Sequence, residues 1–295
     1  MEQYSDIKRL MEARENFKNM ANLKRVISKV IFKVIITILC VTQFSLAKAQ
    51  EITEENYRKV DNAIWSQLEQ EFKLFRINHN KKVYAIAEQK NVEAAIKYAS
   101  VPSGLQRLFM LRLSVPKDTI SNILKTLPDN MQSSPYAKSL LYHVETEQIA
   151  EGSKYYNFQA TDTEGKNFTL SSLEGKNILL LYGGLNCLRE KGRSNLHKVY
   201  KKTEHIRNNF EIVVFCERSS DLEHLKQEQT KYHQSLPFDY FLVSDYLKDH
   251  SPVKILYGAQ ATPTCFLINP NGIVVMKTIG LDRRRVNKLL KEQKK

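Results

Sequence analysis

The sequence predicts an all-helical region followed by an α/β domain. Three observations support this division. Residues 51–149 carry apolar side chains at helical spacing, and strands alternate with helices after the linker at 150–154. The apolar run 177–182 then ends in Gly183 and Gly184, shortly before Cys187 at the head of an expected helix. Alternating strands and helices are the signature of α/β layers.

The composition is that of an ordinary globular chain with a basic balance. The 295 residues are 42% hydrophobic, which suits about two domains, and the formal net charge is +13 at pH 7. Acidic residues are interspersed with the basic ones, and no nucleic-acid-binding signature accompanies them. We therefore expect the excess charge to serve solubility or association with the cell envelope, with no nucleic-acid partner.

Residues 1–49 have the pattern of a targeting segment. Basic residues precede the apolar stretch 34–47, and Ala47-Lys48-Ala49 supplies a small-x-small cleavage pattern before Gln50. The stretch is shorter than the roughly 20 residues of a membrane span. We expect an exported protein, in the periplasm or cell envelope. Two alternatives stay open: translation from Met20, and an uncleaved anchor that would be the chain's contact with the membrane.

Residues 50–149 are expected to form a helical N-terminal region. Its clearest apolar stripe runs from Tyr57 to Phe75 at spacings of three and four, and Trp65 lies just off it. A second helical piece runs through 82–99. The region has no cysteine and no carboxylates or histidines at ligand spacing. Its stripes are typical of a packed core, and a docking or substrate-presenting role is the expectation.

Three start signals divide the rest of the helical region. Ser103 and Gln106 form a capping box, and Asp118 is placed to cap a following helix. Ser134 followed by Pro135 opens the last helix, because proline is favoured at the first helical position.

Residues 150–295 are expected to form the α/β domain. The expected strands are 177–182, 211–216, 240–243, 264–268 and 273–279, and the expected helices are 188–200, 222–233, 251–257 and 283–294. The β-branched residues of 211–216 suit a buried pleat. Asn269-Pro-Asn-Gly272 has the composition of a hairpin turn between the last two strands.

Four features together resemble the thioredoxin superfamily over roughly 152–295. They are the lead-in 157–176, the strand–turn–helix around Cys187, the loop Ala261-Thr-Pro263-Thr, and the closing hairpin 266–275. The sequence is most similar to the envelope thiol–disulfide oxidoreductases and to their peroxiredoxin-like relatives, the alkyl hydroperoxide reductase/thiol-specific antioxidant (AhpC/TSA) group. The resemblance implies a thioredoxin-like fold, in which helices flank a central mixed sheet.

Cys187 is the candidate catalytic nucleophile. A cysteine at a strand-to-helix junction faces unpaired N–H groups, which favour the reactive thiolate. Glu190 would disfavour the thiolate, whereas Arg189 and Arg193 would favour it. In a dithiol member of the superfamily the motif reads Trp-Cys-x-x-Cys, and its second cysteine resolves mixed disulfides. Here Asn186 replaces the tryptophan and Glu190 replaces that cysteine.

Thr262 and Pro263 are the expected substrate-binding residues. The resemblance implies that their peptide bond is cis and that the loop presents backbone groups to an extended partner chain beside Cys187. Cys216 and Cys265 lie in expected strands and are expected in the core. Cys265, two residues past the proline, is a candidate resolving thiol. No metal-ligand spacing, phosphate loop or nucleotide fingerprint is present, so we expect no metal and no cofactor.

These observations lead to two function hypotheses of different classes. The first is a monothiol disulfide oxidoreductase that acts on protein thiols in the cell envelope and is resolved by an external thiol reductant or partner protein. The second is a redox-inactive module that binds an extended peptide. A single-cysteine peroxidase, which would turn over through a sulfenic acid, ranks lower. A peroxidase of the family kind has Thr or Ser three residues before its cysteine, where this chain has Gly184.

Overall fold

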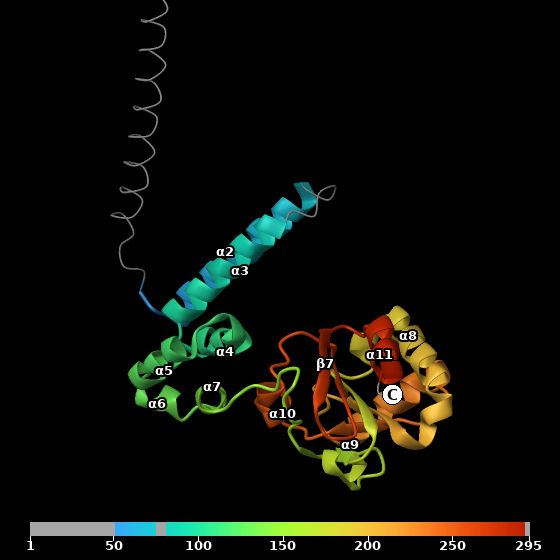
Figure 1. Ribbon diagram of the computed structural model, residues 1–295. Coiled ribbons are helices and arrows are strands. Elements are labelled where there is room, and N and C mark those ends of the chain that lie inside the picture. Colours follow the sequence, from blue (N-terminus) through green and yellow to red (C-terminus); the bar gives the residue numbers. More distant parts are fainter. Residues whose placement is uncertain (1–50, 75–80, 293–295) are drawn as a thin grey trace, which may run out of the picture. The chain divides into compact units, whose positions relative to one another are not determined.

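The computed structural model describes residues 51–74 and 81–292 (Figure 1). The expected targeting segment, residues 1–49, lies outside the described residues. Within the described part of the chain, no helix combines the length and the apolar character needed to cross a membrane.

The N-terminal region is helical, as the sequence predicts. Its helices are α2 (Glu54–Leu74), α3 (Lys81–Lys97), α4 (Pro102–Met110), α5 (Lys117–Thr126), α6 (Asp129–Gln132) and α7 (Pro135–Glu145), with a 3₁₀ turn at Arg112–Ser114. The stripe expected on the first helix is confirmed for its described side chains, because Tyr57, Ile64 and Leu68 are buried. Trp65 is 45% exposed, as its position off the stripe predicts.

The predicted capping box at Ser103 is wrong. Helix α4 begins one residue earlier, at Pro102, and Val101 is its N-cap without a side-chain cap bond. Both the backbone N–H and the hydroxyl of Ser103 bond instead to the Glu54 carboxylate of α2. A carboxylate from another helix satisfies these donors, so the serine is used in tertiary packing.

The other two start signals have opposite outcomes. Ser134 is an N-cap as predicted, and its hydroxyl accepts a bond from the Ala137 N–H at 3.3 Å. Asp118 is not a cap, because α5 begins at Lys117 directly after Pro116. The fixed φ of proline defines that start, and Asp118 lies in the first turn, where its charge complements the helix dipole.

The α/β region contains a seven-stranded mixed sheet, which confirms the predicted fold class. The strand order is β2-β1-β5-β4-β3-β6-β7. The strands are β1 (Gln159–Asp162), β2 (Asn167–Thr169), β3 (Asn177–Tyr182), β4 (Phe210–Phe215), β5 (Phe241–Ser244), β6 (Thr264–Ile268) and β7 (Val274–Ile279). Central β3 runs parallel to β4 and antiparallel to β6. The short hairpin β1–β2 lies in the lead-in, where no strand was expected.

Helices cover both faces of the sheet. They are α8 (Arg189–Lys202), α9 (Leu222–Tyr232), α10 (Pro252–Leu256) and α11 (Arg283–Glu292). Leu179 and Leu181 of β3 share a core with α8, α9 and α11. Leu180 and Tyr182 of β3 point to the opposite face, where they share a core with α10 and the lead-in. Successive side chains of β3 point to opposite faces of the sheet, so this one strand contributes to the core on each face.

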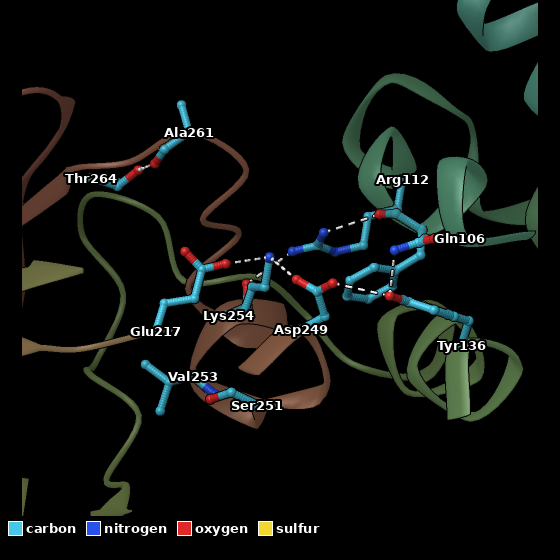
Figure 2. A network of polar contacts seen from close by, with 11 residues as sticks. Gln106, Arg112, Tyr136, Glu217, Asp249, Ser251, Val253, Lys254, Ala261 and Thr264 are labelled. Carbon is cyan, nitrogen blue, oxygen red and sulfur yellow. Dashed lines mark hydrogen bonds and ion pairs between the residues drawn. The ribbon is translucent and has the colours of Figure 1, made fainter. Parts of the chain in front are cut away.

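A buried ionic cluster joins the helical region to α10 (Figure 2). Lys254 of α10 is 4% exposed, and its ammonium lies 2.5 Å from carboxylate oxygens of both Glu217 and Asp249. Arg112, which follows α4, is fully buried and donates to the Lys254 carbonyl at 2.9 Å. Tyr136 of α7 donates to Asp249 at 3.0 Å.

This junction makes the two regions parts of one packed unit. Ile255 of α10 belongs to the same apolar core as Leu108 and Leu140 of the helical region. Burial lowers the pKa of Arg112 to about 10, because its guanidinium is removed from water at the junction. We expect that truncating the chain at the predicted boundary near residue 150 would expose both apolar and charged groups.

Lys254→Met should lower the free energy of unfolding by about 3–5 kcal/mol, because two carboxylates lose their buried partner. The control is Lys176→Met, which breaks a half-exposed pair with Glu211 and should cost less than about 1 kcal/mol. Urea denaturation of the two variants measures both values. Equal losses would contradict the role assigned to the buried cluster.

Candidate active site

The loop after β3 requires its two glycines. Gly183 has φ +125° and Gly184 has φ +85°, a region that favours glycine. A Cβ on Gly183 would lie 2.7 Å from the Cβ of Thr262, and a Cβ on Gly184 would lie 2.7 Å from a carboxylate oxygen of Glu228. The loop is therefore pressed between the Thr262–Pro263 segment, whose peptide bond is cis, and helix α9.

Cys187 lies in a 3₁₀ turn, Asn186–Leu188, that precedes α8. The sequence predicted a cysteine between a strand and the head of a helix, and Cys187 does lie between β3 and α8. Arg189 has φ +52° and ψ 179°, a conformation almost confined to glycine, and it separates the turn from α8. Consequently, Cys187 and Glu190 do not share a regular helical turn, although their spacing is that of a dithiol motif.

Helix α9 holds the Cys187 turn through two side chains. The Glu228 carboxylate accepts the Leu185 N–H at 2.5 Å and the Asn186 N–H at 3.3 Å. One helical turn further on, the Tyr232 hydroxyl donates to the Asn186 side chain at 2.6 Å. These N–H groups begin the turn that carries Cys187. In this structure both N–H groups bond to the Glu228 carboxylate of the same chain.

Cys216 also interacts with the Glu228 carboxylate. It directly follows β4 and is 1% exposed. Burial, and after it the charge and hydrogen bond of Glu228, raise the pKa of the Cys216 thiol well above its usual value. Cys187 contributes a smaller electrostatic effect in the same direction. Cys216 is therefore the buried thiol that interacts with the Cys187 site, and it is held in its protonated form.

Cys265 is separated from this arrangement. It lies in β6, paired in register with Leu181, and is fully buried. Burial alone raises the pKa of its thiol to about 12. Since a thiolate is the attacking species in disulfide exchange, neither buried cysteine is prepared to resolve a mixed disulfide at neutral pH. Cys187 is half-buried and is the most accessible of the three described cysteines.

The charged residues expected to modulate Cys187 have different surroundings. Arg189 and Glu190 are exposed at the start of α8. Arg193 is half-buried, and its guanidinium carbon lies 4.5 Å from the centre of the Tyr232 ring. Its Nε is buried and has no hydrogen-bond partner among the described residues. Arg193 thus packs against the side chain that orients Asn186.

The Thr262–Pro263 segment has one residue whose backbone polar groups are unbonded among the described residues. The Pro263 carbonyl accepts the Gly280 N–H at 2.8 Å, so a partner chain cannot use it freely. The backbone N–H and carbonyl of Thr262 form no hydrogen bond within the described part of the chain. The described residues also contain no group of three or more His, Cys, Asp or Glu side chains that could hold a metal ion.

The sequence did not reveal Glu228 or Tyr232. Their i, i+4 spacing places them on one face of α9, but a glutamate in a polar helix looks like any solvated residue. The one signal in the sequence was indirect. Two consecutive glycines before Cys187 indicate a crowded loop, without saying which side chain crowds it.

The comparisons with known proteins each match about half of the chain. No family model matches the chain. The thiol-disulfide oxidoreductase ResA of Bacillus subtilis (strain 168) is 28% identical over 134 residues, which are 45% of this chain and 70% of ResA. ResA of Bacillus anthracis is 27% identical over 140 residues, covering 47% of this chain and 75% of that protein.

Solved structures give similar matches. The thioredoxin domain of a thiol-disulfide oxidoreductase from Bacteroides vulgatus has a TM-score of 0.40 at 20% identity, covering 48% of this chain and 99% of that one. A thiol peroxidase from Chromobacterium violaceum has a TM-score of 0.40 at 16% identity, covering 50% of this chain and 90% of that one.

The sheet and its flanking helices define a thioredoxin-like protein. Within that class, the sequence is similar to the thiol-disulfide oxidoreductase family that includes ResA, as the motifs predicted.

Glu228→Gln should increase the rate of iodoacetamide alkylation at Cys187 by about threefold, because it removes a negative charge that opposes the thiolate while keeping an acceptor for the two N–H groups. Glu223→Gln is the control, since it removes the same charge from an exposed position on the same helix. Mass spectrometry of the labelled peptides gives both rates. Equal rates in the two variants would contradict this role of Glu228.

Proposed function

We propose that this chain is a monothiol disulfide oxidoreductase that acts on protein thiols in the cell envelope, with Cys187 as its nucleophile. The observation that carries the proposal is the contrast among the three described cysteines. Cys187 is half-buried on a turn that follows a loop in contact with the Thr262–Pro263 segment, whereas Cys216 and Cys265 are buried. Similarity to ResA supports thiol chemistry on this fold.

The reaction is a thiol–disulfide exchange. The Cys187 thiolate attacks one sulfur of a partner's disulfide, so a bond forms between Cys187 and that sulfur while the partner's other sulfur leaves as a thiolate. An external thiolate then attacks the Cys187 sulfur of the mixed disulfide, so the partner's first sulfur also leaves as a thiolate and Cys187 is joined to the external thiol. A second external thiolate attacks that external sulfur and releases the Cys187 thiolate. The partner's disulfide is thereby reduced to two thiols, and two external thiols are oxidised to one disulfide.

Two features favour resolution from outside the chain. Glu190 occupies the place of the second cysteine, and a carboxylate cannot displace sulfur from a disulfide. The raised pKa values of the Cys216 and Cys265 thiols leave little thiolate at neutral pH. A mixed disulfide at Cys187 should therefore be long-lived.

The substrate-binding role belongs to Thr262 and Pro263. Gly183 lies against both residues, so the loop and the Cys187 turn are neighbours. The free peptide groups of Thr262 can pair with an extended partner chain, as an additional strand would. Export to the envelope, through cleavage before Gln50 or an anchor at 1–49, is part of the same proposal.

The mixed disulfide formed with a thiopyridyl-activated cysteine peptide should persist in the natural protein and decay only when glutathione is added. Cys216→Ser and Cys265→Ser should leave its lifetime unchanged, because neither thiol attacks it. Intact mass over time measures the lifetime, and Cys187→Ser is the negative control.

Three outcomes would overturn parts of this proposal. A longer lifetime in Cys216→Ser would mean that Cys216 resolves the disulfide. A Cys187 that never reacts with the peptide would favour the redox-inactive binding module. Rapid consumption of hydrogen peroxide with formation of a sulfenic acid at Cys187 would favour the peroxidase.

Glu190→Cys should create insulin-reducing activity with dithiothreitol, because it restores the spacing of a dithiol motif. Arg189→Gly/Glu190→Cys should gain more, since glycine can adopt either the present φ of +52° or a helical one. Turbidity of reduced insulin gives the rates. If neither variant gains activity, the shape of the turn, and not the missing thiol, limits turnover.

A further inference from the structure

The positive charge of the α/β region is concentrated on two helices. Residues 150–295 contain 23 Lys or Arg and 16 Asp or Glu. Helices α8 and α11 together hold eleven of the basic residues and only two of the acidic ones. The remainder of the region therefore has slightly more acidic than basic residues, and the excess charge has a definite location.

These two helices pack side by side (Figure 1). Their apolar sides enter one core beneath the sheet, through Leu196 and Val199 of α8 and through Val286 and Leu290 of α11. Because the apolar residues face the sheet, the basic side chains are left on the outer surface. We call this surface the α8–α11 face, and it comprises the Lys and Arg residues of those two helices.

Most of these charges have no ion-pair partner. Within the described part of the chain, Arg285 pairs with Glu151 at 2.6 Å and Lys288 lies 3.8 Å from Glu292. Among the described residues, no ion pair joins the other basic side chains of the two helices, which are Arg189, Lys191, Arg193, Lys198, Lys201, Lys202, Arg283, Arg284 and Lys291. Their charge can therefore act on a ligand.

The α8–α11 face begins at the candidate nucleophile. Arg189 and Lys191 follow the Cys187 turn directly and are exposed. A protein that brings a disulfide to Cys187 therefore meets this charge on approach. Clustered charge of one sign raises the local concentration of an oppositely charged partner and its association rate.

We infer that the α8–α11 face is the docking surface for an acidic segment of the protein whose cysteine reacts with Cys187. This inference rests on the proposed function and adds the chemistry of the partner. The acidic segment would lie along α8, while its cysteine lies beside the Thr262–Pro263 loop.

The residues on the face favour a protein partner over a lipid surface. A helix that binds in the membrane interface inserts Trp, Phe or Leu side chains from one side. Among the described residues, the exposed large apolar side chains include none from α8 or α11. The buried apolar side chains of the two helices pack into the core beside the sheet, so they cannot insert into a lipid layer.

A pair of matched peptides tests the inference. Each has about twelve residues, which span about 40 Å when extended, compared with about 20 Å for the 14 residues of α8. Each carries one cysteine activated as a thiopyridyl disulfide, and the other residues alternate glycine with Glu or with Lys. The Cys187 thiolate attacks the peptide sulfur and releases thiopyridone, whose absorbance gives the second-order rate.

The acidic peptide should react about tenfold faster than the basic one at low ionic strength, and the difference should largely vanish near 1 M salt. Lys198→Glu/Lys201→Glu, on the face but away from the thiol, should reduce the ratio at least severalfold. Lys125→Glu/Lys138→Glu is the matched control, because it changes two exposed lysines of the helical region and should keep the ratio.

The outcomes separate this inference from the proposed function. If neither peptide reacts with Cys187, the proposed function fails. If both react at equal rates, or if the two double variants have the same ratio, the docking face is wrong while the thiol chemistry stands. A third outcome would assign the face to a membrane surface. In that case the two peptides react at equal rates, and the protein co-sediments with vesicles rich in phosphatidylglycerol while Lys198→Glu/Lys201→Glu does not.

Discussion

The carboxylate of Glu228 determines the shape of the segment on which the chemistry depends. It bonds two consecutive N–H groups at the start of the Cys187 turn and lies 2.7 Å from where a Cβ on Gly184 would be. Burial, and after it the charge and hydrogen bond of the same carboxylate, raise the pKa of the Cys216 thiol. One side chain of α9 thus bonds the backbone next to the half-buried Cys187 and also contacts the buried Cys216. The site depends on a helix that sequence motifs do not include.

A second group of buried charges connects this site to the rest of the chain. Glu217 directly follows Cys216, and it bonds Lys254 on the side of the helical region. Two consecutive residues at the end of β4 therefore have different partners. Cys216 contacts Glu228 at the Cys187 site, and Glu217 contacts Lys254 at the junction with the helical region. The helical region, which has no recognisable motif, is structurally continuous with the site through these contacts.

The sequence predicted the fold where periodicity and turn chemistry agree, and the site only in part. Central strands such as 177–182 were found because a short apolar run bounded by turn residues is typical of a buried strand. The short hairpin β1–β2 was missed because its strands have only three or four residues. Cys187 was proposed as the nucleophile from its local motif, and it stays a prediction. Glu228 was not, because its role depends on a contact with residues 43 and 42 positions away.

The contact between Gly184 and Glu228 also limits how this chain could change its chemistry. Peroxidases of the related group carry Thr or Ser at the position of Gly184. A side chain there would collide with the Glu228 carboxylate and would have to adopt a φ of +85°. Acquiring that hydroxyl therefore requires the Glu228 carboxylate to move away from its two N–H partners, and it places a side chain on a strained backbone. A substitution at position 184 would thus act on the Cys187 turn as well as on position 184 itself.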